Sequence, residues 1–579
     1  MTGLPPVAPS VLADVLDDLP PRLRTRVDAA LARAADWVVT VDGDQASAPL
    51  DDETTVTWRL SGGVLTASDA LTCSCLLAPR CLHRGVAVAA APTADPVSVE
   101  APREAPAEIL AEDVTEDVTD AERTAATALW SAGATVLRAG ASGSGTVVRA
   151  ELLRAVHRAR VVGLHRAAAS GLRVAAALTA ARTSDPSFDR AELTEDLLDL
   201  LLLCHDLRTG TAAPALLRGT ARREYRPVGS LRLYGLCTEA VVAGTGHAGV
   251  VTHLVDESGV LWSVPAILPG GAERVATAAN GPVAIGESGL THRALGRSGL
   301  LLSGGTASPD HRLGAGRKVR AVAARGVGWH EAPAVSLWQE PLPDQVSRAF
   351  AAHTLPDSHR PAGADLLFLD AEVLGAAGPA LRVATDDTPL DLTGEDDRTR
   401  ENLRVLATAT GARLRVIARL LPHHPGTAVA LAVQGDALTL PSAMNGTVDL
   451  ALDRLQRSHV PTGEARELLP RRPPEQRVPP PLHPLRNLVH RIALAGRPVA
   501  TATSADRDTG ALTANGLATT ASVLATLTAT THARHRDAFG RTTDDHTDDF
   551  PRAWLTAALH LRAFTTATAR QAWRSHTEA

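Results

Sequence analysis

The feature that most constrains this chain is a cluster of metal-binding residue types in the stretch LTCSCLLAPRCLHRG, residues 71–85. The chain has 5 cysteines, and Cys73, Cys75 and Cys81 all lie within this stretch, with His83 two residues after the last of them. Three thiolates and one imidazole form a donor set that fills the tetrahedral shell of a structural zinc ion. We therefore predict one structural Zn²⁺ at these residues, with no open position for a catalytic water.

The residues around the cluster predict how the chain presents the four ligands. In an extended backbone, residues two apart point to the same side, so Cys73 and Cys75 can converge on one ion. Pro79 argues against a continuous helix between the two pairs of ligands. The segment RGVAVAAA after His83 predicts a short helix. Its N-terminal end carries partial positive charge and is expected to face the metal and its thiolates.

Other interpretations of the cysteines remain open at this point. They can be incidental buried thiols beside an exposed histidine, whereas a Cys73–Cys75 disulfide would be strained at this spacing. The first residues, MTGLPPVAPSVLADVL, lack the basic region and the apolar stretch of a signal peptide, and no apolar run reaches the length of a membrane span. We therefore expect a cytoplasmic, thiol-reducing location, where clustered cysteines bind metal more often than they form disulfides.

The pattern C-x-C-x5-C-x-H formed by these residues resembles the SWIM zinc finger family, whose pattern is C-x-C, a variable spacer and C-x-H. The resemblance covers residues 40–91 and implies a small ββα unit. The segments TVTWRL (55–60) and GVLTASDAL (63–71) are the two expected strands, and the segment after His83 is the expected helix.

The resemblance also implies a function. Members of the SWIM family are associated with DNA binding and with protein contacts, and this chain resembles stand-alone SWIM proteins of high-GC bacteria. Some of those are encoded near MoxR-type AAA ATPases and von Willebrand A proteins, which implies a protein of either kind as a partner. This chain departs from the SWIM pattern at Leu76-Leu77, where members of the family often carry proline or polar residues; the departure affects no expected ligand.

The length of 579 residues and the ordinary globular composition predict an α+β multidomain protein. Helical spacing alternates along the chain with period-two, β-branched segments, so we expect a small zinc finger, helical segments and two antiparallel, barrel-like β-rich blocks. The expected parts are N-terminal helices at 1–39, the finger at 40–91, an acidic Pro-rich linker at 92–122, a helical domain at 123–220, β-rich domains at 221–345 and 360–460, a Pro-rich linker at 461–484 and a C-terminal helical domain at 485–579. Whether either β-rich block is an oligonucleotide-binding barrel stays open, because aromatic residues for base stacking are scarce, at 3%.

Charge patterning bears on nucleic-acid binding. A formal net charge of −6 argues against a protein that coats nucleic acid by bulk charge, but it leaves local basic patches possible. Arg80 and Arg84 flank the cysteine cluster, and Arg154 and Arg158 share one face of the expected helix RAELLRAVHRARVVGLHRAAA. These four arginines are candidate phosphate contacts. An ordinary solvated helix surface is the alternative for the second pair.

Sequence signatures of catalysis are missing. There is no G-x-S-x-G motif, and the G-x-G-x-x-G at 244–249 is followed by the strand-like VVTHLVD, so we expect a hairpin turn there instead of a dinucleotide site. The C-terminal segment places His532, His535 and His546 among aspartates, which leaves open a second metal site or a polar loop.

These observations predict a zinc-binding, non-enzymatic adaptor that uses a SWIM-type finger to bind nucleic acid or protein. The alternative is an accessory protein of a MoxR AAA ATPase and von Willebrand A system that acts through protein contacts alone. A weaker alternative is a metal-dependent hydrolase that uses the C-terminal His/Asp cluster. No membrane partner is expected.

Overall fold

The chain folds into two compact units, each formed by two separate parts of the sequence. Unit 1 comprises residues 1–221 and 478–562, and unit 2 comprises residues 222–477 and 563–579. The computed structural model describes residues 4–51, 53–92, 117–210, 213–220, 223–244, 246–286, 288–314, 319–464, 466–470, 478–502, 505–532 and 547–578. Helices and sheets occur together, which confirms the α+β class. Among the described residues, no helix combines the length and apolar character that crossing a bilayer would require.

Both predicted linkers fall partly on residues that the structure does not describe. Residues 93–116 lie outside the described ranges, and they hold most of the expected acidic linker at 92–122. Residues 471–477 are likewise outside, within the expected Pro-rich linker at 461–484.

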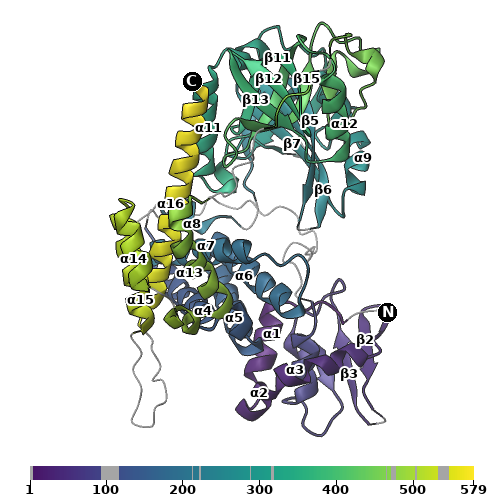
Figure 1. The fold of residues 1–579 in the computed structure, drawn as a ribbon. Helices are drawn as coiled ribbons and strands as arrows, with labels where there is room; N and C mark the ends of the chain where they lie inside the picture. The colour runs from purple at the N-terminus through teal and green to yellow at the C-terminus, as the bar shows by residue number, and fades with distance from the viewer. Residues whose placement is uncertain are drawn as a thin grey trace. The chain divides into compact units, whose positions relative to one another are not determined.

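Unit 1 begins with a four-stranded antiparallel sheet that leads into a short helix (Figure 1). The strands pair in chain order, and the elements are β1 (Thr40–Asp42), β2 (Gln45–Pro49), β3 (Thr55–Arg59), β4 (Leu71–Cys73) and α3 (Leu82–Ala89). Alternate residues of β3 face the core, and Val56 and Trp58 are fully buried.

This arrangement differs from the ββα unit expected from the resemblance. Two further strands, β1 and β2, precede β3 and pair with each other. Gly43 lies in the tight turn between them and takes the positive φ that such a turn requires. The expected strand at 63–71 is mostly turn and 3-10 helix, and its last residue, Leu71, is where β4 begins. The strand at 55–60 and the helix after His83 are present as expected.

Two N-terminal helices pack on this small sheet domain. They are α1 (Pro9–Asp17) and α2 (Pro21–Ala30), and both contact α3. The contact is close at Gly85 of α3, where an added Cβ would lie 2.7 Å from a methyl group of Leu19 and 3.2 Å from one of Val27. The backbone also joins the parts, since Leu65 donates to the Pro6 carbonyl at 2.9 Å. The N-terminal helices and the sheet therefore form one packed body.

The rest of unit 1 is helical. Helix α5 contacts α1, and so links this helical part to the N-terminal body. A capping box starts α4, in which Glu122 accepts from the Thr119 backbone at 2.7 Å. The helices are α4 (Asp120–Gly143), α5 (Thr146–Val161), α6 (His165–Thr183), α7 (Arg190–Thr209), α8 (Pro214–Arg218), α13 (His483–Ala495), α14 (Ala505–Ala514), α15 (Ala518–His532) and the first part of α16 (Asp549–Thr577).

Unit 2 contains two antiparallel β-rich blocks. The first is a six-stranded sheet of order β10-β8-β5-β6-β7, with β9 paired to β8. Its strands are β5 (Arg226–Ala243), β6 (His247–Asp256), β7 (Leu261–Pro269), β8 (Gly299–Ala307), β9 (Leu313–Gly314) and β10 (Arg320–Ala324). Ala243 of β5 pairs with His247 of β6, so the glycine motif at 244–249 does start with a hairpin turn. The described strands form an open sheet, with β10 and β7 at its edges, where a barrel-like block was expected.

The second block is a closed five-stranded barrel. Its strands are β11 (Leu366–Ala377), β12 (Ala380–Thr385), β13 (Thr388–Thr393), β14 (Arg413–Leu420) and β15 (Thr427–Gln434), and β16 (Thr447–Asp449) extends it beside β15. A parallel pairing of β13 with β15 closes the ring, and α12 (Asp397–Leu406) lies between β13 and β14 in the chain. This strand order and helix position are those of the oligonucleotide/oligosaccharide-binding type of Greek-key barrel. Connectivity of this kind describes a fold and assigns no ligand.

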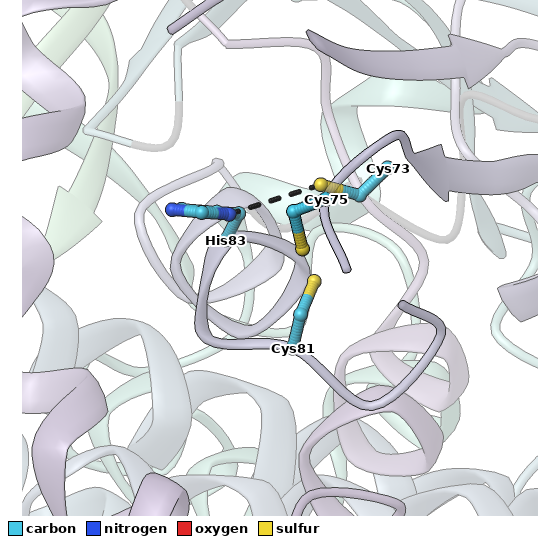
Figure 2. A group of neighbouring side chains, drawn as sticks. All are labelled: Cys73, Cys75, Cys81 and His83. Carbon is cyan, nitrogen blue, oxygen red and sulfur yellow. Dashed lines mark hydrogen bonds between the residues drawn. The ribbon is translucent and has the colours of Figure 1, made fainter. Parts of the chain in front are cut away.

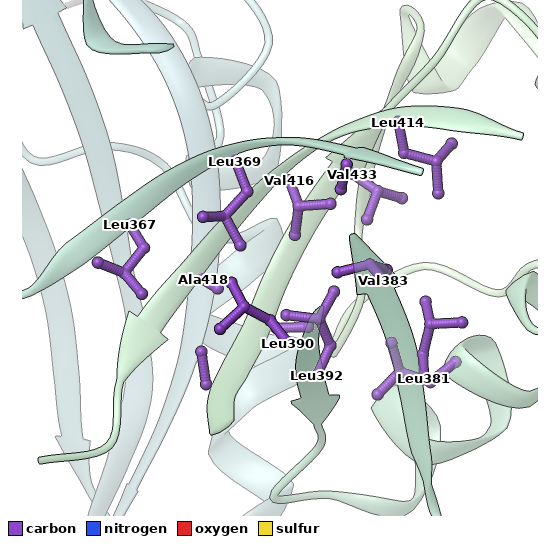
Figure 3. Close-up of a cluster of buried hydrophobic side chains, with 14 of the residues drawn as sticks. Leu367, Leu369, Leu381, Val383, Leu390, Leu392, Leu414, Val416, Ala418 and Val433 are labelled. Carbon is purple, nitrogen blue, oxygen red and sulfur yellow. The ribbon is translucent and has the colours of Figure 1, made fainter. Parts of the chain in front are cut away.

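Apolar side chains fill the barrel. Leucines and valines from all five strands point inward and meet in one cluster (Figure 3). Outside the ring, the barrel and the open sheet share a second core, in which Trp338 lies against Phe368 with ring centroids 5.1 Å apart. Asp449 of β16 joins the two blocks by accepting from the Thr238 backbone at 2.9 Å and from Arg297 at 3.3 Å. The two blocks thus fold as a single unit.

The end of α16 completes the barrel core. Trp573 is fully buried among the barrel residues, and its indole nitrogen donates to the Leu421 carbonyl at 3.1 Å. Ala569, one turn earlier, is buried in the same cluster. This part of α16 belongs to unit 2, whereas residues 549–562 belong to unit 1.

We expect Trp573→Ala to destabilise unit 2 by about 3–5 kcal/mol, because it leaves a large cavity in the core and an unsatisfied carbonyl at Leu421. Arg570→Ala, at an exposed position of the same helix, is the matched control and should change stability by less than about 0.5 kcal/mol. Urea unfolding followed by tryptophan fluorescence and circular dichroism would measure both. Equal stability of the two variants would contradict the role assigned to Trp573.

Candidate metal centre

The four predicted ligands converge at the junction of sheet and helix in unit 1. Cys73 is the last residue of β4, Cys75 follows in the turn, Cys81 is the N-cap of α3 and His83 lies in its first turn. One ligand atom from each residue lies within 4.8 Å of all the others. Figure 2 shows the sulfur atoms of Cys75 and Cys81 facing each other and a dashed line that joins the Cys73 sulfur to the His83 imidazole. Among the described residues, this is the one group of three or more histidine, cysteine or acidic side chains placed to hold a metal ion.

The spacing of the ligand atoms fits a tetrahedral ion. Metal–sulfur and metal–nitrogen bonds of ~2.3 and ~2.0 Å give a tetrahedron with edges of about 3.5–3.8 Å. The Cys73 sulfur lies 3.8 Å from Nδ1 of His83, close to the sulfur–nitrogen edge of about 3.5 Å. The widest separation of up to 4.8 Å requires a contraction of about 1 Å, within reach of side-chain rotation. The donor set can therefore hold one metal ion with all four positions filled by the protein.

Backbone hydrogen bonds hold the first two ligands in place. Ser74, which separates them, accepts from the Thr55 backbone at 2.8 Å and donates to the Glu53 carbonyl at 2.9 Å. The carbonyl of Cys75 accepts from the Ala78 backbone at 3.0 Å and closes the next turn. The C-x-C segment is thus fastened to the start of β3, and both cysteines are half-buried.

Burial sets the protonation of the thiols in the absence of a cation. It raises the pKa of Cys73 to about 12 and also raises the pKa of Cys81, and nearby thiols add to both shifts. Both thiols are therefore protonated at neutral pH in the metal-free protein. A metal ion must displace these protons to bind, so affinity for the metal increases with pH.

The two arginines beside the cluster have different environments. Arg84 is buried, and its guanidinium donates to the Pro79 carbonyl and, at 2.6 Å, to the Ser68 carbonyl. It ties the loop between the ligand pairs to the segment before β4, and its donors are turned into the protein. Arg80 is exposed at the surface of that loop. Of these two candidate phosphate contacts, Arg80 alone has its side chain presented to solvent.

The second pair of candidate phosphate contacts lies on α5. Arg158 is exposed and Arg154 is half-buried, with interactions of its own inside the protein. Helix α5 is connected to the cluster through α1, which contacts both α5 and α3. The proposed phosphate-binding role of these arginines stays a prediction.

The remaining cysteines and histidines fall outside the cluster. Cys204 on α7 and Cys237 on β5 are fully buried in separate cores. His535 and His546 of the C-terminal His/Asp cluster lie outside the described residues, and so does the side chain of His532. The prediction of a second metal site there therefore stays a prediction.

Comparison with known proteins finds no matching family model, no similar curated protein and no similar solved structure. The resemblance to the SWIM family thus rests on the spacing of the four ligands and on the strand and helix that flank them. The metal-binding capacity rests on geometry alone.

Metal content should depend on the cluster and on no other cysteine. Wild-type protein should contain about one zinc per chain, and Cys81→Ser should contain almost none, because a hydroxyl is a poor substitute for one of four closed-shell ligands. Mass spectrometry of the native protein and a chromogenic zinc assay would measure this.

Cys204→Ser and Cys237→Ser are the matched controls and should keep the metal. Chelation and Cys81→Ser should both make residues 40–91 sensitive to protease, because a domain of some fifty residues has too small a core to stay folded alone. A fragment that begins near residue 117 should resist. Full zinc retention by Cys81→Ser would contradict the assignment.

Arg84 and Arg80 offer a second matched pair. Arg84→Ala should lower the stability of the N-terminal body by about 1–3 kcal/mol, since two carbonyls lose a buried donor, and should weaken metal retention against a competing chelator. Arg80→Ala should leave both unchanged. Thermal unfolding and a chelator competition assay would compare the variants, and identical behaviour would show that the Arg84 contacts are not needed.

Proposed function

We propose that the cluster of Cys73, Cys75, Cys81 and His83 holds one structural zinc ion in a SWIM-type finger. The soft, mostly thiolate donor set favours zinc over magnesium or calcium, which prefer oxygen ligands. Four protein ligands leave no position for a substrate or a reactive water, which supports a structural role. The strand that ends at the first cysteine and the helix that starts at the second ligand pair support the SWIM assignment.

We further propose that the finger makes this protein a non-enzymatic adaptor. The observation that carries the proposal is the surface of the loop between the ligand pairs. Leu76 is fully exposed and Leu77 is 65% exposed. Burial of a leucine side chain contributes about 1.5–3 kcal/mol of free energy, so leaving both exposed is unfavourable for the isolated protein. Cys75 and Cys81 bracket this loop, so a bound ion would hold the two leucines in a rigid, protruding position.

The chemistry of the loop favours a protein partner. Apolar side chains held rigidly at a surface gain energy when a partner covers them, and they add little to phosphate binding. Arg84 is engaged inside the protein, which leaves Arg80 as the one basic group of the loop with an exposed side chain. Nucleic acid is therefore the second candidate ligand. No contact in the described residues supports a particular partner, so a MoxR-type ATPase or a von Willebrand A protein stays a prediction. A hydrolase activity at the C-terminal His/Asp cluster also stays a prediction.

The double variant Leu76→Ser, Leu77→Ser should abolish partner capture while it keeps one zinc per chain, because neither residue is a ligand. The measurement is a pull-down from a nuclease-treated lysate of the source cells, with quantitative mass spectrometry of the captured proteins. Cys81→Ser should lose the same proteins through loss of the fold.

Leu469→Ser is the matched control, since Leu469 is 88% exposed but lies in unit 2. It should capture the same proteins as wild type. If the double variant also captures them, the loop is not the docking surface. If capture requires nucleic acid and depends on Arg80, the finger binds nucleic acid and the protein-partner proposal fails.

A further inference from the structure

Two cysteines of the candidate metal centre are also placed for thiol chemistry. The sulfur atoms of Cys75 and Cys81 face each other, and both residues are free thiols in the structure (Figure 2). To form a disulfide, the two sulfur atoms must move from no more than 4.8 Å to about 2.05 Å apart. Rotation of the two side chains about their Cα–Cβ bonds supplies a movement of this size.

The geometry of the cluster selects this pair among its three cysteines. Cys73 and Cys75 are too close in sequence for an unstrained disulfide. The sulfur of Cys73 lies instead 3.8 Å from Nδ1 of His83. Cys73 is also the last residue of β4 and pairs with Val56 of β3, so the sheet fixes its backbone. The sulfur atoms of Cys75 and Cys81 are therefore the two that can be joined.

The loop between the two cysteines already brings its ends together. The Cys75 carbonyl accepts from the Ala78 backbone at 3.0 Å, which closes a turn. Arg84 donates to the Pro79 carbonyl and so ties the far side of the loop to α3. Cys75 follows β4 and Cys81 precedes the first residue of α3. A disulfide between them would close a ring that lies outside both the strand and the helix.

The two cysteines differ in exposure in the way that a two-step oxidation requires. Cys75 is half-buried, and residues 76–80 beside it are all exposed, so a small oxidant can approach it from the loop. Cys81 is 1% exposed. Cys75 is therefore the cysteine that an oxidant reaches, and Cys81 is the enclosed thiol that can attack it from within the protein.

We propose that Cys75 and Cys81 form a redox modification site that reacts with peroxides and thereby controls whether the metal stays bound. The inference rests on the proposed function, because its starting state is the finger with one ion and four protein ligands. A bound cation holds both cysteines as thiolates, and the thiolate is the form of cysteine that attacks a peroxide.

The chemistry is a two-electron oxidation with a hydroperoxide as the oxidant. The Cys75 thiolate attacks one peroxide oxygen and the O–O bond breaks, which gives a sulfenic acid at Cys75 and one hydroxide ion. The Cys81 thiolate then attacks the Cys75 sulfur, the S–O bond breaks and a second hydroxide ion leaves. Two thiolates and one hydrogen peroxide thus become one disulfide and two hydroxide ions, which balances atoms, charge and electrons.

The disulfide removes two of the four ligands. Cys73 and His83 remain, and two ligands do not complete the tetrahedral shell of a structural zinc ion. The metal should therefore leave as the disulfide forms, and the loop with Leu76 and Leu77 loses the ion that holds it. A thiol reductant with added zinc reverses the step. Peroxide regulates the proposed docking surface in this way.

Peroxide titration of the zinc-loaded, full-length protein tests the inference. We expect hydrogen peroxide to release about one zinc per chain to a chromogenic indicator while two thiols are lost, and dithiothreitol with added zinc to restore both. Mass spectrometry of tryptic peptides identifies the bond. Cleavage after Arg80 separates Cys81 from the other two cysteines, and fragmentation between Cys73 and Cys75 shows which of them is joined to it. The expected product is a Cys75–Cys81 disulfide, with Cys73 still open to alkylation.

Two matched variants keep four ligands and differ in the oxidisable pair, because imidazole replaces thiolate in many zinc sites. Cys73→His retains the pair and should release zinc at the wild-type rate. Cys75→His removes it and should release zinc at least tenfold more slowly. Equal rates in the two variants, or a wild-type disulfide that involves Cys73, would overturn the inference while the zinc site stands. Absence of zinc from the untreated wild-type protein would contradict the proposed function itself.

Discussion

Three thiols and an imidazole converge at one point in the N-terminal body, and the packing of the sheet against the helices depends on this convergence. It joins the end of β4 to the start of α3, and α3 is the element on which α1 and α2 pack. The raised pKa values of Cys73 and Cys81 mean that the two thiols do not stabilise each other as thiolates. A bound cation would make their close approach favourable. The junction in turn determines where the loop with Leu76 and Leu77 leaves the surface.

The ligand set was predictable because it is local. Eleven residues of sequence hold all four candidate ligands, so spacing and residue type were sufficient to name them. The strand count was not predictable. The segments of β1 and β2 are short and carry several polar residues, so they show no apolar alternation that would predict strands. Their pairing depends on the turn at Gly43, which takes a positive φ. The role of Arg84 was also missed, since an arginine beside a metal cluster gives the same sequence signal whether it faces a ligand or two backbone carbonyls.

In unit 2 the limits of sequence reasoning have a different cause. Alternation of apolar residues indicated two β-rich blocks, but ring closure depends on the parallel contact of β13 with β15, which alternation cannot specify. The contact between the two blocks is less visible still, because Thr238, Arg297 and Asp449 come from distant parts of the chain and match no motif.

The position of Trp573 has a consequence for the order in which the chain can fold. The ribosome makes the five barrel strands long before it makes the end of α16, and until then the barrel core lacks Trp573 and Ala569. An emerging chain therefore holds an incomplete barrel with exposed apolar surface, the kind of intermediate that chaperones bind and that aggregates at high concentration. A premature stop codon anywhere before this helix would leave the barrel permanently in that state. Such truncated products would present that apolar surface to the proteases that remove incompletely folded chains.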